Sequence, residues 1–493
     1  MLRLSERLAE MAEKTQIGND GIRDARKLGV PKMLVLGFQH MFAMFGATVL
    51  VPLLTGLDVA TTLLFAGLGT LLFHVITGMK IPAFLGSSFA FLGGYAGVKA
   101  MGTANGLTEA QMLPYACLGV ACAGLVYLVL AALIKGLGAK RVMKFFPPIV
   151  TGPIIIAIGL GLAGSAVNNC STNWGLAVVA LAIVVVFNIW GKGMAKIIPI
   201  LLGVLGSCAV AAICALAFGQ TITTANGDVI AFLGNEGMTL FSVSALENLK
   251  NAAWIGIPVV WEHTVFGGVD FSNTSLIISS IVAIMPISLA TMMEHIGDIS
   301  AISSTVGRNF IEDPGLHRTL TGDGLATSIA SLFGAPANTT YGENTGVLAL
   351  SKVYDPRVIR LAAVFAAVLS FSPKFAALVN LIPTAVIGGI SFILYGMISA
   401  IGVRNVVENK VDFTKSRNLI IAAIILVSAL GISAVTFAIG AITISLSGLA
   451  VASIAGIVLN AILPGKDYEF GKDETGDTAT NFAVGANTEN FAE

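Results

Sequence analysis

The sequence predicts an all-α protein that crosses a membrane many times. Of its 493 residues, 55% are hydrophobic and 11% are charged, whereas a soluble domain carries about 25% charged residues. The mean hydropathy is +0.86. The apolar stretches are long, which indicates helices rather than the strands of a barrel.

Fourteen apolar segments follow one another along the chain, and several are shorter than the ~20 residues that a helix needs to cross a bilayer. We expect them near residues 33–54, 59–78, 82–101, 112–134, 147–167, 174–191, 196–218, 276–302, 322–335, 338–353, 358–379, 383–403, 418–436 and 442–463.

The basic residues predict the orientation. With the N-terminus inside, all of the 28 Lys and Arg residues except Lys99, Lys250 and Lys374 fall on the cytoplasmic side, as the positive-inside rule requires. Residues 1–32 are then a cytoplasmic segment without the apolar core of a signal peptide. The polar tail 464–493 is predicted to be cytoplasmic and disordered.

The segment 219–275 is predicted to lie outside the cell, between the seventh and eighth spans. It is polar, with Gly and Asn turns and several aromatic residues. An ordered external cap and a simple linker insertion both fit this composition.

The two halves of the chain resemble each other. QHMFAMFGAT in the first span matches ATMMEHIGD in the eighth, GSSFAF matches TTYGEN, and PPIVTGPIII matches PTAVIGGISF. Because each half has seven spans, an odd number, the halves enter the membrane in opposite directions. The sequence therefore predicts inverted repeats over 33–218 and 276–463, as in many secondary transporters.

Two carboxylates lie within apolar stretches. They are Glu294, followed by His295 and Asp298, and Glu343, followed by Asn344. Charged groups are costly in a bilayer, so such residues usually face a cavity and bind a substrate or a proton. Glu294 and Asp298 share one helix face, and one of two neighbouring carboxylates should hold a proton near neutral pH. That is what a proton-coupled carrier needs.

Segments 3 and 10 combine small, hydroxyl and aromatic residues, which predicts a short extended stretch before a half-helix. Backbone N–H groups at Phe89 and Gly342 would donate to a ligand's carbonyls, and the carboxylates would accept from its N–H groups. A flat lactam or imide such as a nucleobase fits this set. Phe89, Tyr341 and Tyr395 are candidates for stacking on its ring.

Other classes of protein fit less well. An anion carrier would want a basic or neutral pocket, and a membrane enzyme would need a nucleophile–base set or metal ligands. EHIGD lacks the two-histidine spacing of a zinc helix. We therefore expect no enzyme activity, no metal and no cofactor beyond the coupling ion.

Several motifs resemble the nucleobase–ascorbate transporter family, also called nucleobase–cation symporter-2, and in particular its bacterial uracil permease branch. They are FQHMFAMFGATVLVP, KIPAFLGSSFAFLGG, EHIGD, DPGLHR, GAPANTTYGENTGV and LYGMISAIGVR. The resemblance covers roughly residues 31–463. It implies a core domain (33–134 and 276–379), a gate domain (147–218 and 383–463) that also forms a homodimer, and elevator-type transport across the cell membrane, with no nucleic-acid partner.

The resemblance also implies roles for single residues. Glu294 and Glu343 match the carboxylates that bind the base, and Phe89 and Gly342 match the main-chain donors. Positions around the ring and pocket are matched by Ala47, Ser88, Tyr341 and Tyr395, and proton coupling is implied at Asp298, Glu294 and His40.

One position departs from the pattern. Uracil permeases carry a coupling His where this chain has Asp298, and an acid there resembles the purine-transporting branch. That branch typically has Gln-Asn where this chain has Glu343-Asn344. Uracil is therefore the first candidate substrate and xanthine or uric acid the second, and Asp298 leaves sodium coupling open beside proton coupling.

Overall fold

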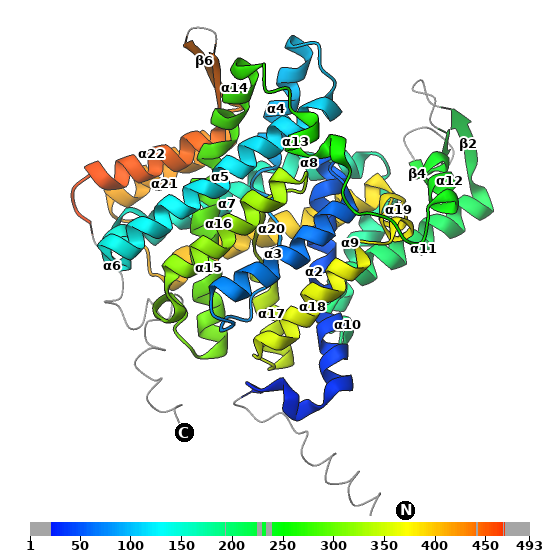
Figure 1. Ribbon diagram of the computed structural model, residues 1–493, viewed down its shortest axis with the longest axis horizontal. Coiled ribbons are helices and arrows are strands. Elements are labelled where there is room, and N and C mark those ends of the chain that lie inside the picture. Colours follow the sequence, from blue (N-terminus) through cyan, green and yellow to red (C-terminus); the bar gives the residue numbers. More distant parts are fainter. Residues whose placement is uncertain are drawn as a thin grey trace, which may run out of the picture.

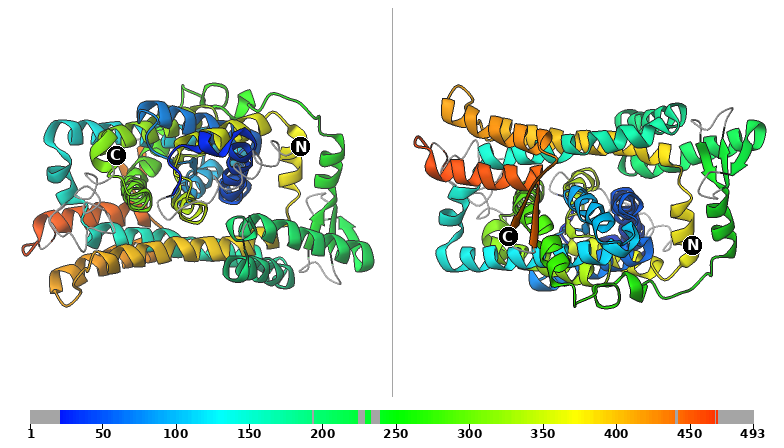
Figure 2. Two further views of the ribbon diagram at one scale, coloured as in Figure 1. Left: turned by 90° about the horizontal axis from the view of Figure 1, so that it is seen from below. Right: turned by 90° about the horizontal axis from the view of Figure 1, so that it is seen from above.

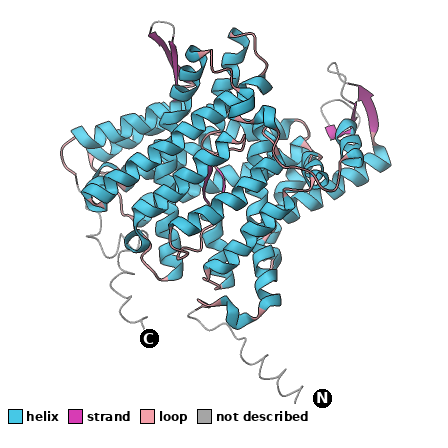
Figure 3. Ribbon diagram, in the orientation of Figure 1, coloured by secondary structure: helices cyan, strands magenta, loops and turns pink. Residues whose placement is uncertain are grey.

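The computed structural model describes residues 21–466 and 468, apart from residues 193, 224–228, 233–238 and 440–441. Most of this part of the chain is helical, and its strands form a short pair near the middle, a three-stranded sheet and a two-stranded sheet at the periphery (Figures 1 and 3). Most of the predicted cytoplasmic segment 1–32 and nearly all of the predicted tail 464–493 lie outside the described residues.

The described residues of the first half form one central strand and ten α-helices, with short 3₁₀ turns at Ala25–Leu28 and Met143–Phe145. The elements are α2 (Val30–Thr55), α3 (Val59–Ile76), β1 (Leu85–Ser87), α4 (Leu92–Ala104), α5 (Glu109–Leu137), α6 (Ala139–Val142), α7 (Pro148–Gly161), α8 (Ala163–Ser171), α9 (Trp174–Trp190), α10 (Met194–Ile197) and α11 (Pro199–Phe218).

Small elements join the two halves. They are β2 (Gln220–Thr223), β3 (Val229–Phe232), β4 (Thr239–Ser242), α12 (Val243–Asn251) and α13 (Val265–Gly268). The strands form an antiparallel sheet in the order β2-β3-β4. The segment 219–275 is thus at least partly ordered, and its extracellular placement stays a prediction.

The second half of the chain is also mostly helical. Its elements are α14 (Thr274–Ile284), α15 (Ser288–Val306), α16 (Leu316–Leu332), β5 (Asn338–Thr340), α17 (Gly342–Ser351), α18 (Pro356–Leu369), α19 (Pro373–Asn380), α20 (Thr384–Glu408), α21 (Ser416–Gly431), β6 (Ala434–Ile439), β7 (Ile442–Ser447) and α22 (Gly448–Ile462).

Local sequence signals explain where several helices begin and end. Asp58 caps α3 by accepting the N–H of Thr61, and Thr108 and Gln111 form a reciprocal capping box at the start of α5. Such caps satisfy N–H groups that have no partner within the helix. Gly307 ends α15 with a φ of 71°, a left-handed conformation that glycine adopts at little cost.

Seven helices of the described residues are long and apolar enough to cross a membrane, so the chain is a multi-pass membrane protein. An eighth span is possible if α18 and α19, which meet at 91°, count as one. The helices α9, α21 and α22 are apolar but shorter. The count of fourteen spans stays a prediction.

The structure corrects the sequence prediction near the thirteenth and fourteenth segments. We expected helices over 418–436 and 442–463, but α21 ends at Gly431 and the chain then forms the antiparallel hairpin β6–β7. The sequences AVTFAI and ITISLS are rich in β-branched and aromatic residues, which favour a pleated strand over a helix.

The extended stretches expected in segments 3 and 10 are confirmed. β1 and β5 pair antiparallel, with Leu85 opposite Thr340 and Ser87 opposite Asn338, and all six residues are buried. Thr70 of α3 accepts the N–H of Leu85 through its hydroxyl at 2.9 Å, and Asn338 donates to the carbonyl of Phe65 at 2.7 Å. These contacts satisfy backbone and side-chain polar groups that the bilayer would leave unpaired.

The helices form two groups that lie side by side (Figure 2). In one, α5 packs against α16 and α3 against α18, around the paired strands. In the other, α7 packs against α20 and α21, and α9 against α11 and α20. Glycines allow close approach within the first group: a Cβ on Gly324 would lie 2.6 Å from the carbonyl oxygen of Gly124.

Candidate functional site

A cavity of about 640 Å³ lies between the two groups of helices. One wall comes from the turn after β1, from β5, and from α15 and α17. The facing wall comes from α20, through Met397, Ile398 and Ile401. The cavity extends from buried Phe89 and Tyr341 to Arg404 and Glu408 at the end of α20, where the Arg404 side chain is 68% exposed. It therefore connects the protein interior with one surface of the molecule.

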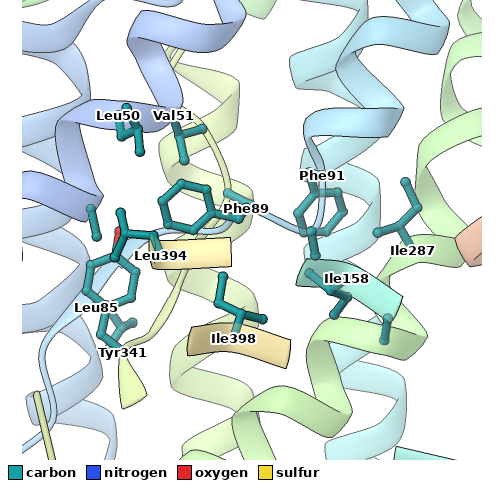
Figure 4. Packing of buried hydrophobic residues seen from close by; sticks show 14 of the residues in the cluster. Leu50, Val51, Leu85, Phe89, Phe91, Ile158, Ile287, Tyr341, Leu394 and Ile398 are labelled. Carbon is teal, nitrogen blue, oxygen red and sulfur yellow. The ribbon is translucent and has the colours of Figure 1, made fainter. Parts of the chain in front are cut away.

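Six of the predicted site residues line this cavity: Ser88, Phe89, Glu294, Asp298, Tyr341 and Gly342. They come from segments far apart in the sequence, which the antiparallel β1–β5 pair brings together. Figure 4 shows Phe89 in the buried cluster that also holds Leu394 and Ile398 of α20.

Three of the four other predicted residues, Ala47, His40 and Tyr395, are not among those that line the cavity. Ala47 and His40 are buried on α2 and Tyr395 on α20. The Tyr395 ring meets that of Phe89 edge to face, 5.8 Å between centroids. The backbone of Glu343 lies in the first turn of α17, but its side chain is outside the described part of the structure.

His40 contacts the site from behind. Its Nδ1 lies 3.1 Å from Oδ1 of Asn344, and Nδ2 of Asn344 donates to the carbonyl of Pro82 at 2.8 Å. The Asn344 side chain thus links α2, α17 and the stretch before β1. In this arrangement His40 helps to hold the start of α17 rather than facing the cavity.

The carboxylates lie on one face of α15. Asp298 is 7% exposed and accepts a hydrogen bond from Thr340 Oγ1 over 3.1 Å. Glu294, one turn earlier, is half-buried. Both line the cavity, and both belong to a segment, Thr274–Val306, that is long and apolar enough to cross a membrane, where a charged side chain without a functional partner is rare.

A backbone donor lies beside these acids in the same wall of the cavity. Gly342 is the first residue of α17, so its N–H belongs to the four at a helix start that lack an intrahelical acceptor, where the helix dipole is positive. Ser88 Oγ is buried and has no hydrogen-bond partner among the described residues. The lining of this one cavity therefore contains hydrogen-bond donors, at Gly342 and Ser88, as well as the acidic acceptors of α15.

Sequence reasoning missed part of the site. Thr339 and Thr340 of β5 line the cavity, and Asp323 of α16 is fully buried, with Oδ2 3.0 Å from His295 Nδ1. Asp323 lies in an apolar segment of the sequence, and the cost of a charged group in a bilayer is the signal that would have identified it. The part of the α20 wall formed by Met397, Ile398 and Ile401 carried no chemical signal, because these residues are apolar.

Comparison with known proteins decides the family. The chain matches the permease family over residues 31–438. It is 38% identical over 477 residues to the uracil permease of Bacillus subtilis (strain 168), which covers 94% of this chain and 98% of that protein. It is 39% identical over 460 residues to the uracil permease of Bacillus caldolyticus, covering 89% and 93%.

The chain belongs to the permease family. It is therefore a transporter and not an enzyme, and the family resemblance that its motifs indicated is confirmed. The transporter also resembles the transmembrane domain of a cyanobacterial bicarbonate transporter, BicA, with a TM-score of 0.55 and 15% identity over 90% of this chain and all of that one. At that identity the likeness concerns the fold alone.

Proposed function

We propose that this transporter imports a nucleobase, uracil first, by proton-coupled symport. The observation that carries the proposal is the cavity whose wall combines acidic side chains of α15 with the turn after β1 and the start of α17. Uracil has carbonyl groups that accept from backbone N–H groups and ring N–H groups that donate to carboxylates. The uracil permease relatives support the same substrate.

Each group has a place in this proposal. Glu294 accepts from the base N–H, with Glu343 as the second acceptor, and the N–H groups of Phe89 and Gly342 donate to the base carbonyls. The aromatic side chains of Phe89 and Tyr341 line the cavity and contact the ring faces. Ser88 Oγ, buried without a partner among the described residues, gains one from the base.

Asp298 is the proposed proton site. It lies one helical turn after Glu294, is nearly buried and lines the same cavity. Two carboxylates at low dielectric do not both ionise cheaply, so one takes up a proton. A sodium ion in place of the proton is the alternative for coupling.

We further infer two inverted repeats of seven segments. If segment 1 corresponds to segment 8, segment 2 to segment 9 and so on, pairs of packed helices should recur with their halves exchanged, and they do. Segments 2 and 11 (α3 and α18) pack together, as do their counterparts, segments 9 and 4 (α16 and α5). Segments 6 and 12 (α9 and α20) pack together, as do segments 13 and 5 (α21 and α7). β1 of the first half pairs with β5 of the second. Two repeats related by a two-fold axis would give these matched pairs of contacts.

In this scheme the group around β1 and β5 is the core domain, and the group around α7 and α20 is the gate domain. The cavity lies between them, as an elevator movement of core against gate requires. It extends to Arg404 and Glu408, which belong to the basic stretch 404–417 that is predicted to be cytoplasmic, so we infer an inward-facing state. Placement in the cell membrane with both termini inside, and a homodimer through the gate domain, complete the proposal.

Two alternatives keep specific support. Asp298 favours a purine such as xanthine or uric acid, because an acid at that position resembles the purine branch. The second alternative is an anion carrier of the related fold, to which only the fold likeness to a bicarbonate transporter connects this chain. Glu294 and Asp298 in the cavity wall disfavour an anion, since like charges repel at short distance.

The test is uptake by purified protein in liposomes. With the interior alkaline, labelled uracil should accumulate, and a proton ionophore should abolish accumulation without blocking exchange. Accumulation that resists the ionophore contradicts proton coupling and calls for the same assay with a sodium gradient. If xanthine competes with labelled uracil more strongly than unlabelled uracil does, the proposed substrate becomes a purine instead of uracil.

A further inference from the structure

An apolar loop crosses one end of the helices that surround the paired strands. It consists of residues 252–271 (the strap), which lie between α12 and α14 and include α13 (Figure 1). Its first nine residues, AAWIGIPVV, contain no charged side chain. Trp254 is nevertheless 75% exposed, Ile257 84% and Trp261 61%. An exposed apolar surface of this kind marks a binding surface.

One end of the strap is fixed to the bend between α18 and α19. The N–H of Gly256 donates to the carbonyl of Phe371 at 2.9 Å, and the N–H of Lys374 donates to the carbonyl of Ala253 at 2.9 Å. The ammonium group of Lys374 also lies 5.3 Å from the centroid of the Trp254 ring. Trp254 is therefore exposed beside a cation, on a backbone that is hydrogen-bonded to the helices beneath it.

Farther along, the strap is bonded to α3 and α5. The Thr61 hydroxyl of α3 donates to the carbonyl of Pro258 at 2.6 Å. The N–H of Asp270 donates to the Tyr115 hydroxyl of α5 at 3.0 Å. The strap cannot turn its exposed side chains inward without breaking these bonds, so their exposure is built into the fold.

The helix ends that hold the strap are opposite the ends that carry basic residues. α3 meets the strap near its first residue and is followed at its other end by Lys80. α5 meets the strap in its N-terminal half and carries Lys135 in its last turn. α18 meets the strap at its C-terminal end and carries Arg357 in its first turn. Because basic residues mark the cytoplasmic side, the strap is predicted to lie at the outer face of the membrane.

Two properties of the strap restrict its depth. Most of its backbone is irregular, outside a 3₁₀ turn at Trp261–His263 and the short helix α13. Irregular backbone exposed to lipid does not occur in the hydrocarbon core, where polar groups have no partners. The apolar side chains, in turn, are unfavourable in water. The headgroup region between these two phases accepts both, and tryptophan is enriched there.

The exposed aromatic side chains continue onto a neighbouring helix end. The rings of Trp261 and Phe266 are stacked with their centroids 6.4 Å apart. The ring of Phe266 meets that of Phe333, directly after α16, edge to face at 5.9 Å. The helices α3 and α5 beside the strap are long and apolar enough to cross a membrane. The strap therefore borders a surface that lipid already contacts.

We propose that the strap is a membrane-binding surface, which inserts its apolar side chains among the lipid headgroups of the outer face and anchors the helices around β1 and β5 at that level. The partner is the lipid bilayer, and Trp254, Ile257 and Trp261 make the main contacts. The stem of Lys374 lies along this apolar surface and keeps its charge at the polar level, as lysine side chains do at membrane interfaces.

The test uses single-tryptophan variants of the full chain in phosphatidylcholine liposomes. The chain has four tryptophans, and replacement of three by phenylalanine leaves either Trp254 or Trp261. Lipids with a nitroxide on the headgroup or deep in the acyl chain quench from the membrane, and iodide on both sides quenches from water. We expect the headgroup label to quench both tryptophans most strongly, and iodide to quench them about threefold less than a water-exposed tryptophan.

Asn105→Trp, in a chain whose native tryptophans are all replaced, is the control. Asn105 is exposed in the polar turn between α4 and α5, near the end of α5 that meets the strap. This reporter should respond to iodide and little to the labelled lipids. If the single-tryptophan variants do not fold, the unaltered protein is compared with the double variant Trp254→Phe, Trp261→Phe, which should lose most of the fluorescence that the headgroup label quenches.

Every other pattern of quenching contradicts the proposal. Iodide quenching of Trp254 and Trp261 equal to that of the control would mean that the strap projects into water as a cap. Strongest quenching by the deep label would place it in the hydrocarbon core. Protection from all three quenchers would mean that protein, such as a second copy of this chain, covers it. None of these results depends on uracil transport, so the proposed function stands or fails separately.

Discussion

Gly342 lies so close to Asp298 that a Cβ at position 342 would stand 2.9 Å from the Asp298 carboxylate oxygen Oδ1. Real Cβ atoms rarely approach a neighbour so closely. The missing side chain therefore lets the start of α17 reach the acidic face of α15. This contact joins the proposed backbone donor and the proposed proton site within one wall of the cavity.

Gly342→Ala should weaken uracil binding by about tenfold, corresponding to roughly 1.4 kcal/mol, because the new methyl group displaces either Asp298 or the α17 backbone. Binding to purified protein measures this. Gly346→Ala is the control, since a Cβ at that cavity-lining position meets nothing within 4 Å. Equal loss in both variants would mean that cavity volume, and not the Asp298 contact, is responsible.

Glu294→Gln should reduce uracil affinity by about 10–100-fold. Hydrogen bonds to charged groups contribute about 1.5–3 kcal/mol, and the new NH₂ group opposes the donor of the base. Glu408→Gln, at the surface end of the same cavity, should change affinity little. Unchanged binding in Glu294→Gln would remove Glu294 from the substrate site.

Asp298→Asn should impair gradient-driven accumulation more than it impairs binding, because asparagine can still accept from Thr340 but cannot release a proton. Uptake with and without a pH gradient, beside equilibrium binding, separates the two effects. Asp313→Asn removes an exposed acid that pairs with Lys80 and should affect neither. A parallel loss of binding and accumulation in Asp298→Asn would argue against coupling at this residue.

Gly324→Ala should lower the stability of the protein by about 1–3 kcal/mol, the usual cost of overpacking a well-packed interior. Its Cβ would lie 2.6 Å from the Gly124 carbonyl oxygen and 2.5 Å from Tyr127 Cβ, so α5 and α16 must separate. Thermal unfolding in detergent provides the measurement. Gly164→Ala, where a Cβ meets nothing within 4 Å, should be neutral, and identical unfolding of both variants would contradict close packing of α5 on α16.

The sequence by itself determined the membrane class, the presence of short extended stretches in segments 3 and 10, and the acids at Glu294 and Asp298. These features depend on local composition: charge is rare in a bilayer, and small and hydroxyl residues interrupt a helix. Sequence patterning failed at β6–β7, because an apolar run of β-branched residues serves a strand as well as a buried helix.

Only the tertiary structure decided which of these residues meet. The antiparallel pairing of β1 with β5 places Ser88 and Phe89 beside Tyr341 and Gly342, some 250 residues away in the chain. The packing of the helices leaves Ala47, His40 and Tyr395 outside the residues that line the cavity and joins His295 to Asp323 behind it. Contacts between distant segments depend on how helices pack in three dimensions, and the pattern of any single segment does not contain that information.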